Sequence, residues 1–321
     1  MNKTDAAGDY LTSLAAVGTP IFGAVAVLGA ISNGLSLSYF VTRTKDSIGN
    51  QLLVILNIFD TLVCLNVLLA YGAPHHLKGI LTPGPMAILQ LVIFWFDVVT
   101  TMVSGLVTAY LCLVRTLSIV HPLYRVSKGG LYGSMGVIVT GIIFQFTFQS
   151  VNFMHHIIIS VYEDKAPKSS LVYFNCWMTL LCFSEIIIII LIVLTACAIS
   201  IKKLMAPNPT LGQKQITESN RKASYTVLSL SSVFVISNGL ASILFIHKMA
   251  TILPNIDRNS EFMETNTSRL VYGMNLTTII ANSMFPLNSL LNPVIYMLRI
   301  ESFRVYTRNL VRRLICALQN P

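Results

Sequence analysis

Residues 184–201 read SEIIIIILIVLTACAISI, and this run decides the class of fold. Glu185 is the single charged residue in it. A helix rises 1.5 Å per residue and the hydrocarbon layer of a bilayer is about 30 Å thick, so about 20 apolar residues cross it. With the apolar residues that precede it from Leu171, the run is long enough to span a membrane. It therefore predicts a transmembrane helix over Leu171 to Ile201.

Six further segments of the chain meet the same test of length and apolar content. They are Leu14 to Phe40, Gln51 to Tyr71, Met86 to Val120, Leu131 to Val161, Lys222 to His247 and Leu270 to Leu298. We therefore predict an all-α membrane protein with a seven-transmembrane helix bundle over residues 14–298. Residues 1–13 form the extracellular N-terminus. Residues 299–321 form a cytoplasmic segment in which arginines alternate with apolar side chains, which is typical of a short amphipathic helix lying on a membrane surface.

The composition excludes several classes of protein. The chain is 54% hydrophobic and 11% charged, whereas soluble domains carry about 25% charged residues. A net charge of +9 favours an acidic partner, but long uncharged stretches argue against nucleic acid.

The six cysteines have no zinc-site spacing. The histidine pairs 75–76 and 155–156 are adjacent, and adjacent residues diverge by about 100° on a helix, unlike an i, i+4 metal pair. We expect no enzyme and no resident cofactor.

The basic residues predict how the chain is threaded through the membrane. If the N-terminus lies outside, 15 of the 22 Lys and Arg fall on the cytoplasmic side. Three acidic residues accompany them, so the inner side carries a net charge of +12, whereas the outer segments hold seven basic and seven acidic residues. Cytoplasmic loops carry the excess of Lys and Arg. We therefore expect an extracellular N-terminus and an inner face that attracts anionic membrane lipid.

The glycosylation sequons agree with this orientation. Asn2 and Asn266 each begin an Asn-x-Ser/Thr sequence in segments expected outside. The first 13 residues are polar, so no cleavable signal peptide is expected and the first apolar segment directs insertion. These features predict a multi-pass protein of the plasma membrane.

Three acidic residues, Asp60, Asp97 and Glu185, fall inside predicted spans. An ionisable group in the membrane costs several kcal/mol unless it faces the bundle interior, so each is a candidate functional residue. Asp60 lies near the centre of its span. Its expected partners are polar residues of other spans: Asn33, Ser104, Asn288, Ser289 and Asn292. The alternative is a neutral, hydrogen-bonded packing cluster.

Helical arithmetic places three polar residues of the third span on one face. Ser104 is 11 residues before Arg115 and Asp97 is 18 residues before it, which correspond to about three and five turns. Asp97 would then lie about 27 Å from Arg115 along the axis, toward the outer side, while Arg115 meets the cytoplasm. Asp97 is either a ligand contact or a structural partner of another helix. Pro293 in the seventh span removes a backbone hydrogen bond and predicts a kink or a hinge.

These residues resemble the rhodopsin-like, class A, G-protein-coupled receptors, and the resemblance covers nearly the whole chain. Residues 288–296, NSLLNPVIY, are similar to the N-P-x-x-Y motif of the family with its preceding polar pair. Residues 115–123, RTLSIVHPL, are similar to the segment from the D-R-Y arginine into the second intracellular loop. Asn33, Asp60 and Phe303 fall where landmarks of the family are expected.

The resemblance implies a function: an extracellular ligand binds the outer half, helix six moves outward, and a heterotrimeric G protein is admitted at the inner face. It assigns this coupling and switch to Arg115, Asn292, Pro293 and Tyr296. It also implies an allosteric Na⁺ site, formed by Asp60, Ser104, Asn288, Ser289 and Asn292. In the surface helix, Cys316 is a candidate for palmitoylation.

The chain also departs from the family pattern. Val114 stands in place of the acid that usually pairs with the arginine, and Asn220 stands near the position of the helix-six acid. We therefore expect a weakened resting-state lock and elevated basal signalling. Cys176 is well placed for the family disulfide, but Gln90 occupies the position of its partner, so we expect this tether to be absent.

The ligand class follows from the residues expected in the outer half. They are Asp97, Thr101, Glu185, Asn238 and Asn282. Two carboxylates without an aromatic cage favour a short basic or amidated peptide over a small amine. Residues 234–238, FVISN, resemble those of invertebrate neuropeptide receptors. A biogenic-amine or chemosensory class A receptor is the alternative, and from another class, an ion channel or transporter that uses the three membrane acids.

Overall fold

The structure is a computed structural model that describes residues 3–43, 48–77, 83–120, 128–161, 168–205, 214–256 and 276–319. Within these ranges the chain is helical. The helices are α1 (Lys3–Val41), α2 (Ile48–Leu77), α3 (Pro83–Val120), α4 (Lys128–Val161), α5 (Lys168–Met205), α6 (Lys214–Ile256), α8 (Leu276–Arg299) and α9 (Glu301–Gln319). Each predicted span falls within one of these helices, except that residues 270–275 of the last one lie outside the described part.

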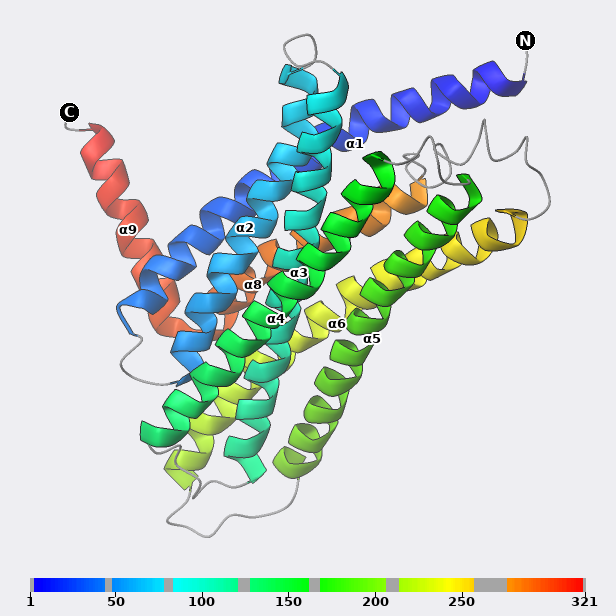
Figure 1. Ribbon diagram of the computed structural model, residues 1–321. Helices are drawn as coiled ribbons and strands as arrows, with labels where there is room; N and C mark the ends of the chain where they lie inside the picture. Colours follow the sequence, from blue (N-terminus) through cyan, green and yellow to red (C-terminus); the bar gives the residue numbers. More distant parts are fainter. Residues whose placement is uncertain are drawn as a thin grey trace.

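The long helices pack side by side into a bundle that closes on itself (Figure 1). Helix α3 runs through the bundle and contacts α2, α4, α5 and α6. Helix α8 contacts α1, α2 and α6 and so closes the ring on the other side. Residues on α3 and α8 can therefore meet side chains from most of the other helices, which places any shared polar site on these two elements.

Five of the helices contain a stretch that is long and apolar enough to cross a membrane. These stretches are Gly23–Val41, Ile48–Ala70, Trp95–Val120, Ser184–Met205 and Ser224–Leu244. In α4 the apolar stretch among the described residues, Gly136–Val151, is shorter. Five of the seven predicted spans thus contain a stretch that is long and apolar enough to cross a membrane. These apolar helices indicate a multi-pass membrane protein. The spans in α4 and α8 remain predictions.

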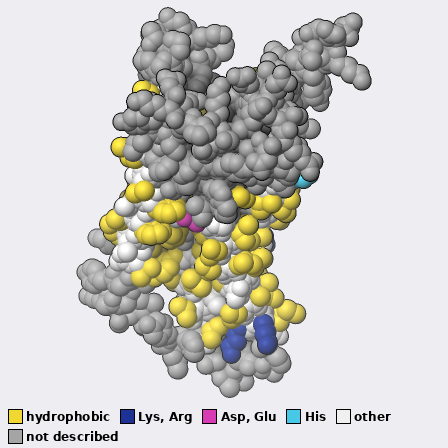
Figure 2. All heavy atoms as spheres, turned by 45° about the vertical axis from the view of Figure 1, so that its right-hand side comes forward, with side chains coloured by type: hydrophobic (Ala, Val, Ile, Leu, Met, Phe, Trp, Pro, Cys, Tyr) yellow, Lys and Arg dark blue, Asp and Glu magenta, His cyan; other side chains and the backbone are white. Residues whose placement is uncertain are grey.

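The outside of the described helices is apolar, unlike the surface of a water-soluble protein, and the core contains both apolar and polar side chains. Apolar side chains cover the outside of the described helices; Ile236 is 70% exposed and Ile243 is 65% exposed. Buried polar side chains include Asn33, Asn57 and Asp60, each with no exposed surface. Figure 2 shows apolar side chains over the middle of one face, with Lys and Arg gathered toward one end of it. Lipid is the environment in which such an apolar surface is stable.

Helix α9 is joined to the bundle by an aromatic cluster. Phe303 is buried and contacts the rings of Tyr39 and Tyr296, with centroid distances of 5.1 and 6.1 Å. The Tyr39 hydroxyl and the Ser302 hydroxyl are 2.6 Å apart. Arg304 donates from Nε to the carbonyl of Met297 and from Nη2 to that of Leu298, both at 3.1 Å, which satisfies carbonyls at the end of α8. The amphipathic helix that the sequence predicts at residues 301–318 is therefore present and fixed at its start.

Candidate functional site

The centre of the bundle contains a hydrogen-bonded cluster around Asp60. Ser104 on α3 donates to Asp60 Oδ1 at 2.7 Å, and Ser289 on α8 donates to the same atom at 3.2 Å. Asn292, also on α8, donates from Nδ2 to Asp60 Oδ2 at 2.6 Å. All four side chains are buried. The fully buried carboxylate thus joins α2, α3 and α8, as its position in the second span predicts.

Pro293 explains the position of Asn33 in this cluster. In a regular helix the carbonyl of Ser289 would accept the backbone N–H of residue 293, but proline has none. Asn33 on α1 donates its Nδ2 to this carbonyl at 2.9 Å, and to the carbonyl of Gly29 at the same distance. The side chain of α1 therefore replaces the missing backbone donor. This contact ties α1 to the point where α8 is weakest.

The cluster extends to α6 through Asn288. Ser237 donates to Asn288 Oδ1 at 3.3 Å, which is long for a hydroxyl donor. Asn238 donates to the carbonyl of Phe234 at 3.0 Å, within its own helix. The link between α6 and the cluster is therefore weaker than the three contacts to Asp60.

A small cavity lies beside the cluster. Its walls include Thr101, Ser104, Asn238, Asn288 and Ser289, and its volume is about 10 Å³, which is room for one water molecule or a small ion. Each of these five residues has a hydroxyl or amide oxygen that can accept a hydrogen bond or coordinate an ion. With the Asp60 carboxylate that binds Ser104 and Ser289, this donor set fits a hard cation such as Na⁺, which prefers oxygen ligands. Of the five residues predicted for this ion, Ser104, Asn288 and Ser289 line the cavity, whereas Asp60 and Asn292 do not and lie beside it through the Asp60 hydrogen bonds.

The residues predicted to bind the ligand are brought together only in part. Thr101 and Asn238 line the cavity, and the buried Thr101 hydroxyl has no hydrogen-bond partner within the described residues. Asp97 lies one turn before Thr101, and its buried Oδ1 also has no partner there. Glu185 instead accepts a hydrogen bond at 3.3 Å from Gln145 on α4. Asn282 belongs to α8, and its side chain lies outside the described part.

The end of α3 presents Arg115. Its buried Nε has no hydrogen-bond partner in the described part of the chain, and Val114 offers no carboxylate. The guanidinium lies against the first turn of α2, so closely that a Cβ at Gly49 would be 2.6 Å from Nη2. A helix N-terminus carries partial positive charge, which disfavours a cation there. Among the described residues, packing rather than an ion pair therefore holds Arg115 in this position.

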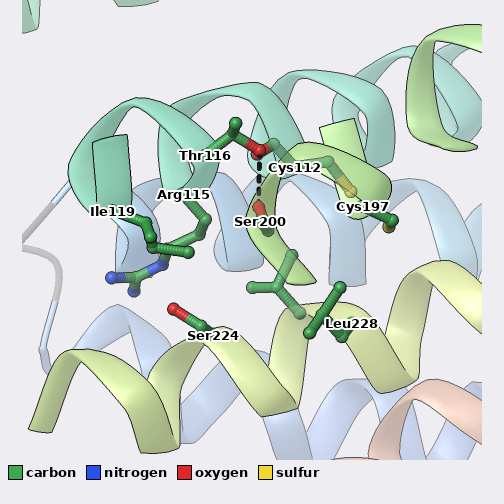
Figure 3. A pocket seen from close by; sticks show the side chains of 9 residues that line it. Cys112, Arg115, Thr116, Ile119, Cys197, Ser200, Ser224 and Leu228 are labelled. Atoms are coloured by element: carbon green, nitrogen blue, oxygen red, sulfur yellow. Dashed lines mark hydrogen bonds between the residues drawn. The ribbon is translucent and has the colours of Figure 1, made fainter. Parts of the chain in front are cut away.

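Figure 3 shows Arg115 in a second cavity, between α3, α5 and α6. Ser224 of α6 lies on the opposite wall, and its side chain is buried. The Thr116 and Ser200 hydroxyls, 2.9 Å apart, connect α3 to α5 beside it. The side chain of Asn220, which the sequence places near the helix-six acid, lies outside the described part.

Tyr296 lies on α8, toward the end of the bundle where α9 begins. Its ring is fully buried and packs edge-on against Phe40 at 5.1 Å. Its hydroxyl lies near the side chain of Asn57, but no hydrogen bond of good geometry joins it to a described residue. The sequence predicts the position of this residue but not that its hydroxyl lacks a partner.

Three predicted modification sites have different outcomes. Asn2 and Asn266 lie outside the described residues. Cys316 is on α9 and exposed, where it is accessible for acylation. Cys176 belongs to α5, but its side chain is not among those described, so the predicted absence of the tether stays a prediction.

Sequence reasoning missed several contacts that the structure shows. Gly49, Gln145 and the Thr116–Ser200 pair carry no recognisable motif. Gly49 is a glycine in the first turn of a helix, where a close approach from another helix is one of the reasons for its use. That signal was available in the sequence, whereas the partner of Gly49 was not.

A scan against protein-family models found no match for the chain, and a search of curated proteins found no relative.

Proposed function

We propose that the chain is a receptor of the rhodopsin-like type, which converts binding of an extracellular ligand into activation of a heterotrimeric G protein. The observation that supports this most directly is the cluster around Asp60. It joins α2, α3 and α8 in the bundle interior. Its connection to α6 is a single 3.3 Å contact. Helix α6 also contacts α3 through Ser231 and Cys112, 2.7 Å apart, and packs against α5 and α8, so movement of α6 would break this polar link to the cluster together with those contacts.

The proposal includes the topology and the location. The chain crosses the plasma membrane seven times, α4 and α8 included, with its N-terminus outside. The basic end of the bundle and the exposed arginines of α9, at 304, 308, 312 and 313, then face the cytoplasm. They attract anionic lipid and the acidic surface of the transducer.

The outer ends of α3 and α6 form the ligand site in this proposal. Asp97 Oδ1 and the Thr101 hydroxyl are buried without partners in the described part, and leaving such groups unpaired costs about 1 to 3 kcal/mol each. A ligand that carries a cation and hydrogen-bond donors would satisfy both. We expect a short basic or amidated peptide, with a biogenic amine or a chemosensory ligand as the alternative. Because Glu185 binds Gln145, contact of the ligand with Glu185 would require that hydrogen bond to break.

Na⁺ is the allosteric ion in this proposal. When bound, it supplies a positive charge that neutralises the Asp60 carboxylate. Asp60, Ser104, Asn288, Ser289 and Asn292 would hold it. Binding favours the state in which these five groups stay together, and an ion shifts an equilibrium only through such a difference in affinity.

The test is a G-protein dissociation assay in cells that express the full chain, screened with basic peptide, amidated peptide and amine libraries. We expect signalling above that of mock cells even without ligand, and its loss in Arg115→Ala at equal surface expression. Replacing Na⁺ by choline in membranes should raise signalling by the wild type but not by Asp60→Asn. Equal second-messenger levels in expressing and mock cells under every library would contradict the proposal. Ion flux in proteoliposomes without G protein would favour a channel or transporter instead.

A further inference from the structure

Two cysteines on different helices lie together beside the inner cavity. In Figure 1, α3 and α5 run side by side in the same direction. The Thr116 hydroxyl contacts the Ser200 hydroxyl at 2.9 Å and the carbonyl of Ala196 at 3.1 Å, which fixes the register of the two helices. Cys112 is four residues before Thr116, and Cys197 is three residues before Ser200. One turn along each helix therefore brings the two thiols to the same level.

The side chains confirm this register. Cys112 and Cys197 line the same cavity, as Figure 3 shows. Ser231 on α6 completes the group, with its hydroxyl 2.7 Å from the sulfur of Cys112. Cys112 is buried, whereas Cys197 is partly exposed. The other cysteines with described side chains, Cys64 and Cys316, lie on α2 and α9.

We propose that Cys112 and Cys197 are an oxidisable dithiol that a peroxide converts into a disulfide between α3 and α5. The partly exposed Cys197 reacts first, because its thiolate is the group that an incoming oxidant can reach. Its sulfur attacks one oxygen of hydrogen peroxide and the O–O bond breaks. Cys197 becomes a sulfenic acid and hydroxide leaves, which takes up the proton released by the thiol and forms water.

The second step joins the two helices. The Cys112 thiol attacks the sulfur of the sulfenic acid, the S–O bond breaks, and the leaving hydroxyl takes the Cys112 proton as a second water. Two thiols have then lost two electrons and one peroxide has been reduced to two waters. Because the thiols already lie together, the disulfide requires no sliding of α3 along α5. Ser231 loses its contact with the Cys112 thiol, so oxidation also changes how α6 is held against α3.

The test uses the full-length protein in lipid nanodiscs. Samples are treated with hydrogen peroxide and denatured, and free thiols are alkylated before and after reduction and assigned by mass spectrometry. We expect Cys112 and Cys197 to lose alkylation together and in equal amounts, to regain it on reduction, and to yield a 112–197 cross-linked peptide. Cys64→Ser is the matched control and should form the same cross-link.

Single variants separate the two steps. In Cys112→Ser, peroxide should leave Cys197 as a sulfenic acid that dimedone traps, and in Cys197→Ser, Cys112 should stay reduced. If a variant fails to fold, the wild type provides a second test. Phenylarsine oxide should protect both thiols from alkylation together, and an added dithiol should reverse this protection. Independent alkylation of Cys112 and Cys197 after peroxide, or a cross-link to any other cysteine, would overturn the proposal. These readouts are chemical, so they do not depend on whether the chain signals.

Discussion

Gly49→Ala tests whether packing alone holds Arg115 in place. A Cβ at this position would lie 2.6 Å from Nη2, 3.2 Å from Cζ and 3.6 Å from Nε of Arg115. Favourable contacts between such atoms begin at about 3.5 Å. The guanidinium must therefore move away from α2 by about 1 Å. Since Arg115 is a long side chain and no carboxylate of a described residue holds it, it can move without disturbing the backbone.

The expected magnitude follows from two opposed effects. Because the clash is with the far end of a flexible side chain, its cost in the arrangement seen here falls at the low end of the about 1 to 3 kcal/mol typical of overpacking, and there is no cost in an arrangement where Arg115 has left Gly49. The equilibrium between the two then shifts by about fivefold or more. Alanine also stabilises a helix by up to about 1 kcal/mol relative to glycine, so the variant should fold. We expect a several-fold rise in basal signalling with no loss of thermal stability.

Gly34→Ala is the matched control, because a Cβ at Gly34 meets nothing within 4 Å. Both variants are assayed for ligand-free G-protein activation at equal surface expression, and for melting temperature after purification. Gly34→Ala should leave basal signalling unchanged. If Gly49→Ala changed signalling no more than Gly34→Ala, the guanidinium would not be seated against α2 and the reasoning would fail.

Three further predictions concern the polar residues of α1, α3 and α8. Asn33→Ala should lower the free energy of unfolding by about 1 kcal/mol in the wild-type background. It should lower it by less in the Pro293→Ala background, because the alanine at position 293 can donate its own backbone N–H to the Ser289 carbonyl. Additive shifts in melting temperature would show that Asn33 does not replace this backbone donor. Asp97→Asn should lower the potency of a cationic ligand more than tenfold, given about 1.5 to 3 kcal/mol for a charged hydrogen bond; unchanged potency in concentration–response curves would remove Asp97 from the site. Tyr296→Phe should leave the melting temperature unchanged, because the hydroxyl has no partner among the described residues, yet lower agonist-driven signalling; normal signalling would show that this hydroxyl has no role in the active state.

The sequence predicts the contacts of Asp60 because membrane depth restricts the choice. A carboxylate in the middle of an apolar span needs polar partners at the same depth, and Ser104, Ser289 and Asn292 are among the few residues that qualify. The structure places all three within 3.2 Å of it. The helices themselves were predictable for the same reason, since apolar length determines where a chain can cross a bilayer.

Contacts that depend on the rotation of a helix were not predictable. Glu185 could have faced the interior beside Asp97, but α5 turns it toward Gln145 on α4. The contact of Arg115 with Gly49 depends in the same way on how α2 and α3 are placed. Hydropathy does not determine such rotations, because the side chains on several faces of these helices are equally apolar.

The satisfied and unsatisfied polar groups have a pattern that bears on the mechanism. In a bilayer, water cannot complete the hydrogen bonds of the interior, so the protein must supply every partner. At the centre it does so for Asp60, which has three donors, and for the Ser289 carbonyl, to which Asn33 donates in place of residue 293; Asn33 Oδ1 and Asn57 Oδ1 are buried there without partners among the described residues.

Toward the two ends it does not. Within the described residues, Asp97 and Thr101 lack partners for buried oxygens on one side of the centre, and Arg115 and Tyr296 lack partners for Nε and the hydroxyl on the other. Each buried group without a hydrogen-bond partner costs about 1 to 3 kcal/mol, and a molecule that supplied the missing partner would recover that energy. A bundle with unpaired polar groups on both sides of the hydrogen-bonded Asp60 can therefore be stabilised differently by molecules that bind at either end, and coupling between two such sites needs only that both molecules favour the same arrangement of the helices.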